Sequence, residues 1–171
     1  YPASDRGKNI LYSVFADRPK HLDPAQSYAS DEALFTRQVY EPPLQYHYLK
    51  RPYELIPLTA AEIPVPRIVE RNGATYSVYD VRIRPGIKFQ PHPGFVAANL
   101  SLERQVVEKL QSPYGLPLAT RDLTADDYIY QIKRLAHPQL HSPIFGLMAE
   151  YIVGLKEYAA QLQKASQPGQ W

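Results

Sequence analysis

The chain has 171 residues, with 19 Lys and Arg against 17 Asp and Glu, and no cysteine. This length suits one domain with a substantial core, and the interspersed charges, at a formal net charge of +2, form no basic stripe suited to nucleic acid. The lack of cysteine excludes disulfides, thiol catalysis and cysteine-bound metals.

The first element that we expect is a strand over Asn9–Phe15. Apolar side chains fall on both of its faces, which is typical of a central strand covered on both sides. The segment Ala16–Pro24 follows as a loop, because Pro19 and Pro24 interrupt any regular structure there.

A helix is predicted from Ser30 to about Tyr40. Ser30 can act as its N-cap, and the acidic residues Asp31 and Glu32 suit the positive end of the helix dipole. The prolines that follow end the helix. The apolar side chains that we expect it to bury are Leu34, Phe35 and Val39.

The middle of the chain predicts a hairpin. Asn72-Gly73 accepts the positive φ angles of a tight turn, with strands expected at Ile68-Val69 and at Tyr76–Arg84. Val81 and Ile83 share one face of the second strand, so we expect both to be buried. Before the hairpin, Leu44–Leu49 alternates weakly, and Leu55–Ile63 is ambiguous, with a short helix expected at Leu58–Glu62.

The last third of the chain predicts helices. Ser101–Gln111 has helical spacing, and Thr124 begins a helix in which the Asp127 carboxylate can reach back to it as a variant capping box. Two further helices are expected at Ile144–Tyr151 and Leu155–Lys164.

The sequence carries no motif for catalysis or for a cofactor. It lacks a nucleophile elbow, a glycine-rich phosphate loop and a paired-histidine zinc motif on a helix. His137 and His141 have a zinc-pair spacing, but Pro138 argues against a regular helix there. The adjacent carboxylates Asp126 and Asp127 are explained by a helix N-terminus. We therefore predict no enzyme activity, no metal and no cofactor.

A series of motifs in a fixed order resembles the family 5 extracellular solute-binding proteins, which bind peptides and related solutes for ABC importers. The resemblance covers about Ile10 to Tyr158. The strand that ends in Ile83-Arg84-Pro85-Gly86-Ile87-Lys88-Phe89 and the later Leu123-Thr124-Ala125-Asp126-Asp127 are its most specific parts. The other motifs are Leu22-Asp23-Pro24, Val39-Tyr40-Glu41-Pro42, Tyr53–Ala60 and His137-Pro138.

The resemblance implies an α/β fold (mixed α+β) that forms part of one lobe of a two-lobed periplasmic-binding-protein-like architecture. Residues 1–165 would be the N-terminal part of lobe I, with residues 90–121 as an insertion typical of larger members. Residues 166–171 are expected to be a disordered tail. Family members run to several hundred residues, so we expect the chain to be a fragment of such a protein.

The resemblance also implies the function. The protein would capture a peptide or peptide-like solute in the periplasm, after removal of a signal peptide, and deliver it as a monomer to the membrane subunits of an ABC permease. The loop after the first strand faces the ligand cleft in the family, which makes Asp17 and Arg18 the best cleft candidates. Tyr40 and Tyr46 are weaker ones.

Two other classes stay open. A protein-interaction module would use exposed tyrosines to contact a partner. A hydrolase would pair His92 or His137 with a nearby carboxylate, although no nucleophile motif supports it.

Overall fold

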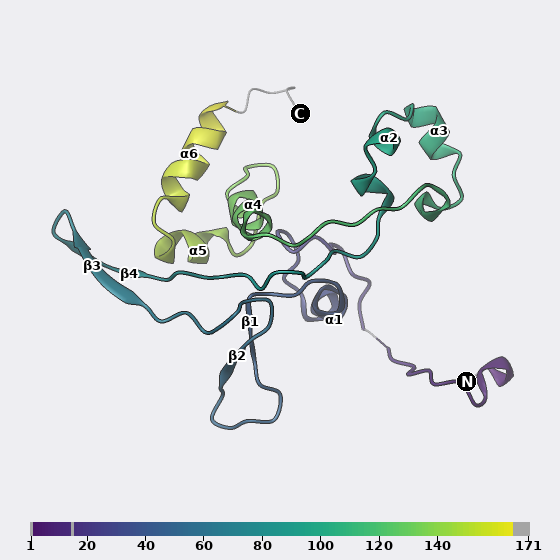
Figure 1. The fold of residues 1–171 in the computed structure, drawn as a ribbon, viewed down its shortest axis with the longest axis horizontal. Coiled ribbons are helices and arrows are strands. Elements are labelled where there is room, and N and C mark those ends of the chain that lie inside the picture. Colours follow the sequence, from purple (N-terminus) through teal and green to yellow (C-terminus); the bar gives the residue numbers. More distant parts are fainter. Residues whose placement is uncertain (1, 15, 166–171) are drawn as a thin grey trace. The chain divides into compact units, whose positions relative to one another are not determined.

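The computed structural model describes residues 2–14 and 16–165 and combines helices with small antiparallel sheets, which confirms the predicted mixed α/β class (Figure 1). The chain divides into two compact units. The first contains residues 1–40 and 132–171, and the second contains residues 41–131. None of the helices in the described residues is long and apolar enough to cross a membrane.

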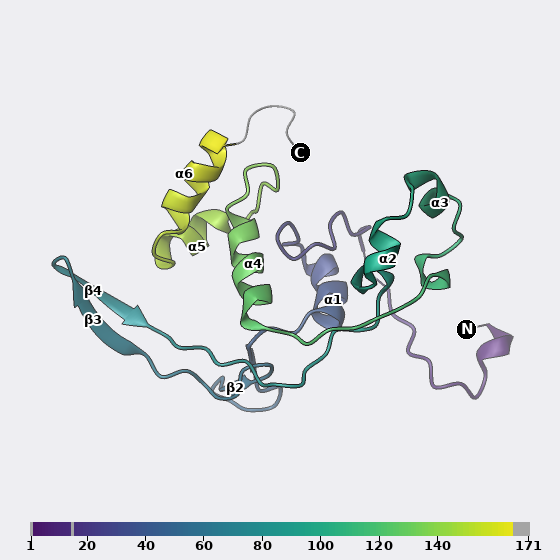
Figure 2. The ribbon, with the colours of Figure 1, turned by 45° about the horizontal axis from the view of Figure 1, so that its top comes forward.

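The core of the first unit is helical. It is built from the end of α4 (Ala125–Leu135), α5 (Phe145–Tyr151) and α6 (Leu155–Ala165), which lie side by side in Figures 1 and 2. The expected helices at Ile144–Tyr151 and Leu155–Lys164 are therefore confirmed within a residue. Buried side chains at the centre are Ala136, Ala149 and Leu155, and half-buried apolar residues packed against them are Ile132, Phe145, Met148, Ile152, Tyr158, Ala159 and Leu162.

Helix α1 (Ser30–Val39) forms where the sequence predicts it, but its burial differs. The three apolar side chains expected in the core are exposed, with 55% of Leu34, 37% of Phe35 and 70% of Val39 accessible to solvent. The residue that α1 does bury is Glu32. An apolar helix face is buried only where another element covers it, so the expectation was wrong for this face.

The predicted strand at Asn9–Phe15 is also wrong for its described part, residues 9–14, while Phe15 lies outside the described residues. Leu11 is 93% exposed and Val14 is 87% exposed. Among the described residues, the N–H of Ile10 donates to the nearby Lys8 carbonyl. An extended segment becomes a strand when a neighbouring strand pairs with its backbone groups, and the described chain places none beside it.

The second unit contains two antiparallel hairpins. One pairs β1 (Leu44–Tyr46) with β2 (Leu55–Pro57), and the other pairs β3 (Arg67–Arg71) with β4 (Ala74–Val78). Asn72 and Gly73 have φ angles of 52° and 74°, as a type I′ turn requires. The Asn-Gly hairpin is therefore confirmed.

The predictions for the segments that follow the two hairpins are wrong. The stretch Leu58–Glu62 is not a helix, because its backbone pairs with the segment that follows β4: Ala60 bridges Ile83, and the Arg84 N–H donates to the Thr59 carbonyl at 2.9 Å. Strand β4 ends at Val78 instead of Arg84. Val81 is 44% exposed, so its expected burial is wrong, whereas Ile83 is half-buried.

Thr59 links the β1–β2 hairpin to helix α4 through a hydrogen bond between side chains. Its side chain is 1% exposed, and its hydroxyl lies 2.6 Å from the Tyr128 hydroxyl. Tyr128 in turn donates to the Glu41 carbonyl at 2.8 Å. Partial burial raises the pKa of the Tyr128 phenol, which keeps it protonated as a donor.

Residues 90–121, the predicted insertion, form a long loop region whose two ends are held together by backbone pairing. We call this region the excursion. His92 bridges Ala119, and Lys88 bridges Asp122. Between these pairings lie α2 (Ala97–Leu100), α3 (Arg104–Glu108) and two 3₁₀ turns at Pro93–Phe95 and Pro113–Gly115. The predicted helix Ser101–Gln111 is thus present only at its centre.

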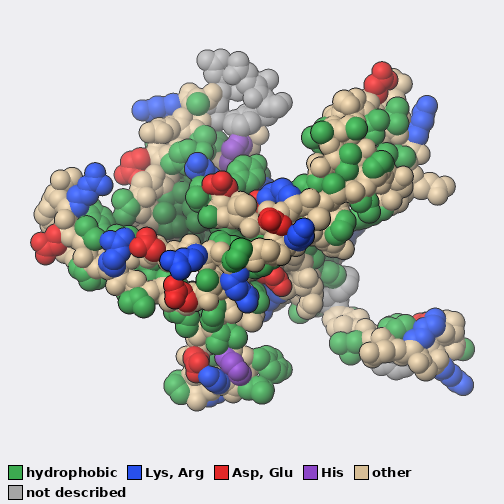
Figure 3. Space-filling model, viewed as in Figure 1, with side chains coloured by type: hydrophobic (Ala, Val, Ile, Leu, Met, Phe, Trp, Pro, Cys, Tyr) green, Lys and Arg blue, Asp and Glu red, His purple; other side chains and the backbone are tan. Residues whose placement is uncertain are grey.

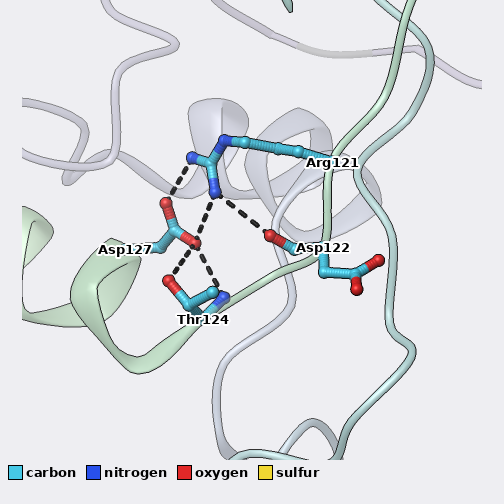
Figure 4. A network of polar contacts seen from close by, with 4 residues as sticks. All are labelled: Arg121, Asp122, Thr124 and Asp127. Atoms are coloured by element: carbon cyan, nitrogen blue, oxygen red, sulfur yellow. Dashed lines mark hydrogen bonds and ion pairs between the residues drawn. The ribbon is translucent and has the colours of Figure 1, made fainter.

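Figure 4 shows how the excursion ends at the start of α4. Arg121 donates to both carboxylate oxygens of Asp127, at 2.9 Å from Nη1, and its guanidinium lies 4.4 Å from the centre of the Phe89 ring. The same carboxylate accepts the Thr124 N–H at 2.9 Å. The reach of Asp127 back to Thr124 is the half of the predicted capping box that forms.

Candidate functional site

A hollow of about 440 Å³ lies in the first unit, between the loop that follows the N-terminal segment and the start of α1. It brings together two of the four predicted cleft residues, Asp17 and Arg18, which are both exposed. The other residues that line it are Pro19, Lys20, Ala29, Asp31 and Glu32.

The two walls of this hollow are joined by one side chain. Glu32 is 4% exposed, and its Oε1 accepts the N–H groups of Lys20 at 3.0 Å and His21 at 2.9 Å. Its Oε2 accepts the N–H groups of Tyr28 at 3.0 Å and Ala29 at 3.2 Å. One carboxylate therefore satisfies four backbone donors and fixes the loop against the N-terminus of α1.

These hydrogen bonds set the charge of Glu32. The backbone N–H of His21, together with those of Tyr28, Ala29 and Lys20, lowers the pKa of Glu32 to about 2, against the opposing effect of desolvation. The carboxylate thus stays ionised at neutral pH with its oxygens engaged. Such a group is suited to holding a loop and poorly suited to general acid catalysis.

A second anchor holds the far end of the same loop. Both nitrogens at the tip of the Arg134 guanidinium donate to the Asp23 carboxylate, which also accepts the Ala25 N–H at 3.0 Å. Gln26 adds a bond to the Leu140 carbonyl at 3.1 Å. Partial burial alone would raise the pKa of Asp23, but its bonds to Arg134 and Ala25 outweigh this and lower it.

Asp17 and Arg18 stand apart from these anchors. Neither makes a hydrogen bond or ion pair with the described part of the chain. Their charged ends are therefore open to a solute, while the backbone that carries them is held from Lys20 onward. Lys20 adds a second cation at the same rim.

Tyr40 and Tyr46 do not line the hollow. Tyr40 ends α1 and is 50% exposed, whereas Tyr46 belongs to β1 in the second unit and is 65% exposed. The structure therefore gathers Asp17 and Arg18 at one place and does not bring the two tyrosines to it.

Sequence reasoning missed Glu32 as the residue that organises this site. The N-cap of α1 is Ala29, one residue before the predicted Ser30, so Glu32 occupies the third helical position. A glutamate there reaches back to the N-cap amide in a capping box, and placing the cap one residue earlier would have indicated this role. The bonds to Lys20 and His21 depend on the path of the loop and have no local signal.

Other candidate chemical groups in the sequence include His137, His141 and Asp127. The two histidines both line a hollow of about 250 Å³, and His141 has a φ of 47°, which is not helical. Among the described residues, no group of three or more His, Asp or Glu side chains could hold a metal ion. Arg121 and two Thr124 groups engage the Asp127 carboxylate, which lowers its pKa, chiefly through the Arg121 bond (Figure 4).

No protein-family model matches the chain, and no match was found among curated proteins or among solved structures.

Proposed function

We propose that this chain forms part of the ligand-facing lobe of an extracytoplasmic solute-binding protein, which captures peptides and delivers them to an ABC importer permease. The proposal is supported by the ordered motifs of the sequence and by the hollow that carries Asp17 and Arg18. Its single most important observation is that the loop expected to face the ligand borders a hollow of about 440 Å³. Sites for small molecules have volumes of about 300–1,000 Å³.

The charges at the hollow fit a peptide. Arg18 offers a planar guanidinium that binds carboxylates through two parallel bonds, and Lys20 offers a second cation. Asp17 can accept from an ammonium group or from peptide N–H groups. Because the Glu32 carboxylate is occupied by backbone amides, it leaves the rim charges free to act on a solute.

The proposed mechanism is closure of two lobes around the ligand. Solute bound to one lobe shifts an open–closed equilibrium only if it contacts both lobes in the closed state. The anchors at Glu32 and Asp23 fit this role, because a pre-organised loop loses little entropy when ligand binds. The proposed location is the periplasm, the partner is the membrane permease, and no cofactor takes part.

Calorimetric titration of a mixture of short peptides into the parent protein tests the proposal. Arg18→Ala should weaken binding about tenfold or more, because a charge-assisted pair contributes enough for such a change. Asp17→Asn should act in the same direction for peptides with a free amino terminus. The matched control is Arg71→Ala at the exposed end of β3, which should leave affinity unchanged.

Two outcomes would contradict the proposal. The first is a parent protein that binds no peptide at all. The second is peptide binding that neither Arg18→Ala nor Asp17→Asn alters, which would place the ligand away from this hollow.

The 171-residue chain alone should bind peptide about a thousandfold more weakly than the parent protein. Half of a two-lobed site leaves one side of the ligand exposed to water, so the contacts with the second lobe are lost.

A further inference from the structure

The loop between β1 and β2 exposes an unusual set of side chains. Tyr48 is 88% exposed, Leu49 76%, Tyr53 70% and Tyr46 65%. In Figure 3 this hairpin, at the bottom of the view, carries apolar side chains next to basic, acidic and histidine ones. We call residues Tyr46–Tyr53 the aromatic loop. A group of large apolar side chains exposed together is typical of an interaction surface.

Contacts within the aromatic loop hold these side chains outward. The rings of Tyr46 and Tyr53 meet edge to face with centroids 5.7 Å apart, and the Arg51 guanidinium lies 4.5 Å from the centre of the Tyr53 ring. The Nδ1 of His47 accepts the N–H groups of Leu49 at 3.2 Å and Lys50 at 3.3 Å. The exposed conformation is thus supported by its own bonds.

The chemistry of the loop matches the surface of an anionic bilayer. Tyrosine rings carry an apolar body and a hydroxyl end, which places them at the boundary between headgroups and acyl chains. Leu49 supplies an aliphatic group at the tip. Lys50 and Arg51 are the cations beside it, and with Glu54 as the one acidic residue next to the loop the net charge there is positive.

A protein partner fits these observations less well. The cores of protein interfaces are depleted in lysine, whereas Lys50 directly follows the exposed Leu49 and pairs with Glu54 at 2.7 Å with both side chains about half exposed. Long basic side chains whose apolar stems lie among rings, with charged ends in water, are typical of a membrane interface.

We propose that the aromatic loop is a peripheral contact for an anionic phospholipid surface, with Tyr48 and Leu49 entering the headgroup boundary and Lys50 and Arg51 binding lipid phosphates. This contact does not depend on peptide binding at the hollow. It would hold the protein against the membrane surface.

Vesicle co-sedimentation tests the proposal. The full chain is mixed with vesicles of phosphatidylcholine alone or with about 30% phosphatidylglycerol, whose surface attracts basic residues. We expect binding to the anionic vesicles that weakens as salt increases. The double variant Tyr48→Ser/Leu49→Ser should reduce the partition coefficient about tenfold or more, since each buried methylene contributes to insertion.

The control variant is Val65→Ser/Ile68→Ser, which removes two other apolar side chains, 81% and 66% exposed, from the same unit. It should bind vesicles as the unchanged protein does. Lys50→Gln/Arg51→Gln should lower binding to anionic vesicles and have little effect on the weak binding to phosphatidylcholine alone. Equal losses in the loop variant and the control would overturn the proposal, because they would indicate non-specific adhesion.

A second measurement reports on the loop itself. Because the chain has no cysteine, Leu49→Cys allows a single environment-sensitive dye to be attached at the tip, with Val65→Cys as the reference position. Anionic vesicles should shift the emission of the dye at position 49 to the blue and leave position 65 unchanged. No shift at position 49 in the folded protein would overturn the lipid contact and favour a protein partner for the same surface.

Discussion

The loop over residues 17–29 and the aromatic loop both carry candidate functional residues, but different chemistry holds them. In the first loop, the Glu32 carboxylate is 4% exposed and accepts four backbone N–H groups. In the aromatic loop, the Arg51–Tyr53 and Tyr46–Tyr53 contacts lie at the surface. Bonds from backbone amides to a buried carboxylate are strong, whereas exposed ring contacts contribute little.

The difference indicates how each loop would meet a partner. The first loop has a fixed backbone and free charged ends at Asp17 and Arg18, which suits the wall of a binding site for a small solute. The aromatic loop has exposed rings, and the ring contacts that hold them lie at the surface, so these side chains can adapt to a soft surface. Substitutions that remove the holding groups should therefore differ in size between the two loops.

The largest effect is expected at the anchor of the first loop. Glu32→Gln replaces an acceptor-only carboxylate with an amide that can offer only one oxygen, so at least two of the four backbone N–H groups lose their acceptor. We expect this substitution to cost more stability than any other in the two loops, and to speed amide exchange at Lys20, His21, Tyr28 and Ala29. Hydrogen exchange measured by NMR gives both results.

The control for this substitution is Glu108→Gln on α3, where the carboxylate pairs only with the exposed Arg104 side chain. It should leave amide exchange in the first loop unchanged. Unaltered exchange at Lys20 and His21 in Glu32→Gln would mean that the carboxylate does not hold this loop.

Acid should weaken the anchor of the first loop. Since the Glu32 pKa is about 2 in the folded protein and near 4.5 in the unfolded chain, its contribution to stability is fully present above about pH 4.5. It is lost as the pH falls toward 2. Asp23, whose pKa is also lowered, acts in the same direction. Amide exchange followed from pH 6 to about pH 2.5 should show this loss at Tyr28 and Ala29, and a much smaller one in Glu32→Gln.

An intermediate effect is expected at the second anchor. Asp23→Asn removes a charge-assisted pair in which the Asp23 and Arg134 side chains are only 28% and 27% exposed, and it should cost about 1–3 kcal/mol. Asp122→Asn is the matched control, because its pair with Lys88 is 4.0 Å long and more than half exposed at both ends. The control should change stability by less than about 0.5 kcal/mol. Equal costs at the two sites, measured by urea unfolding, would show that Asp23 is no anchor.

Local signals explain which parts of the fold could be predicted. The Asn72-Gly73 turn follows from the positive φ that these two residues accept. The start of α4 follows from the reach of Asp127 back to Thr124, three positions earlier in the chain. Both depend on neighbours in the sequence, so pattern and composition are sufficient to predict them.

Two of the failures involve contacts with distant parts of the chain. Residues 9–14 have the composition of a central strand, yet a strand also needs a paired neighbour, which no pattern within the segment specifies. The Leu58–Glu62 stretch is not helical because Thr59 and Ala60 pair with residues that follow β4. In the candidate site, Asp17 and Arg18 were named through the family resemblance, while the role of Glu32 required the folded path of the loop.

The smallest effect is expected in the aromatic loop. Arg51→Ala and Tyr53→Leu, made singly and together, isolate the cation–ring contact in a double-mutant cycle. Exposed contacts of this kind contribute about 0.5–1 kcal/mol, and solvent surrounds this one, because Tyr53 is 70% exposed. We therefore expect a coupling energy of about 0.5 kcal/mol, measured from amide exchange in β1 and β2.

The remaining bonds of Arg51, to the carbonyls of Tyr48 and Lys50, are lost in both variants that lack the arginine and cancel from the coupling energy. A coupling above about 2 kcal/mol would contradict the comparison, since the aromatic loop would then be held as firmly as a buried site and would have little freedom to adapt to a lipid surface.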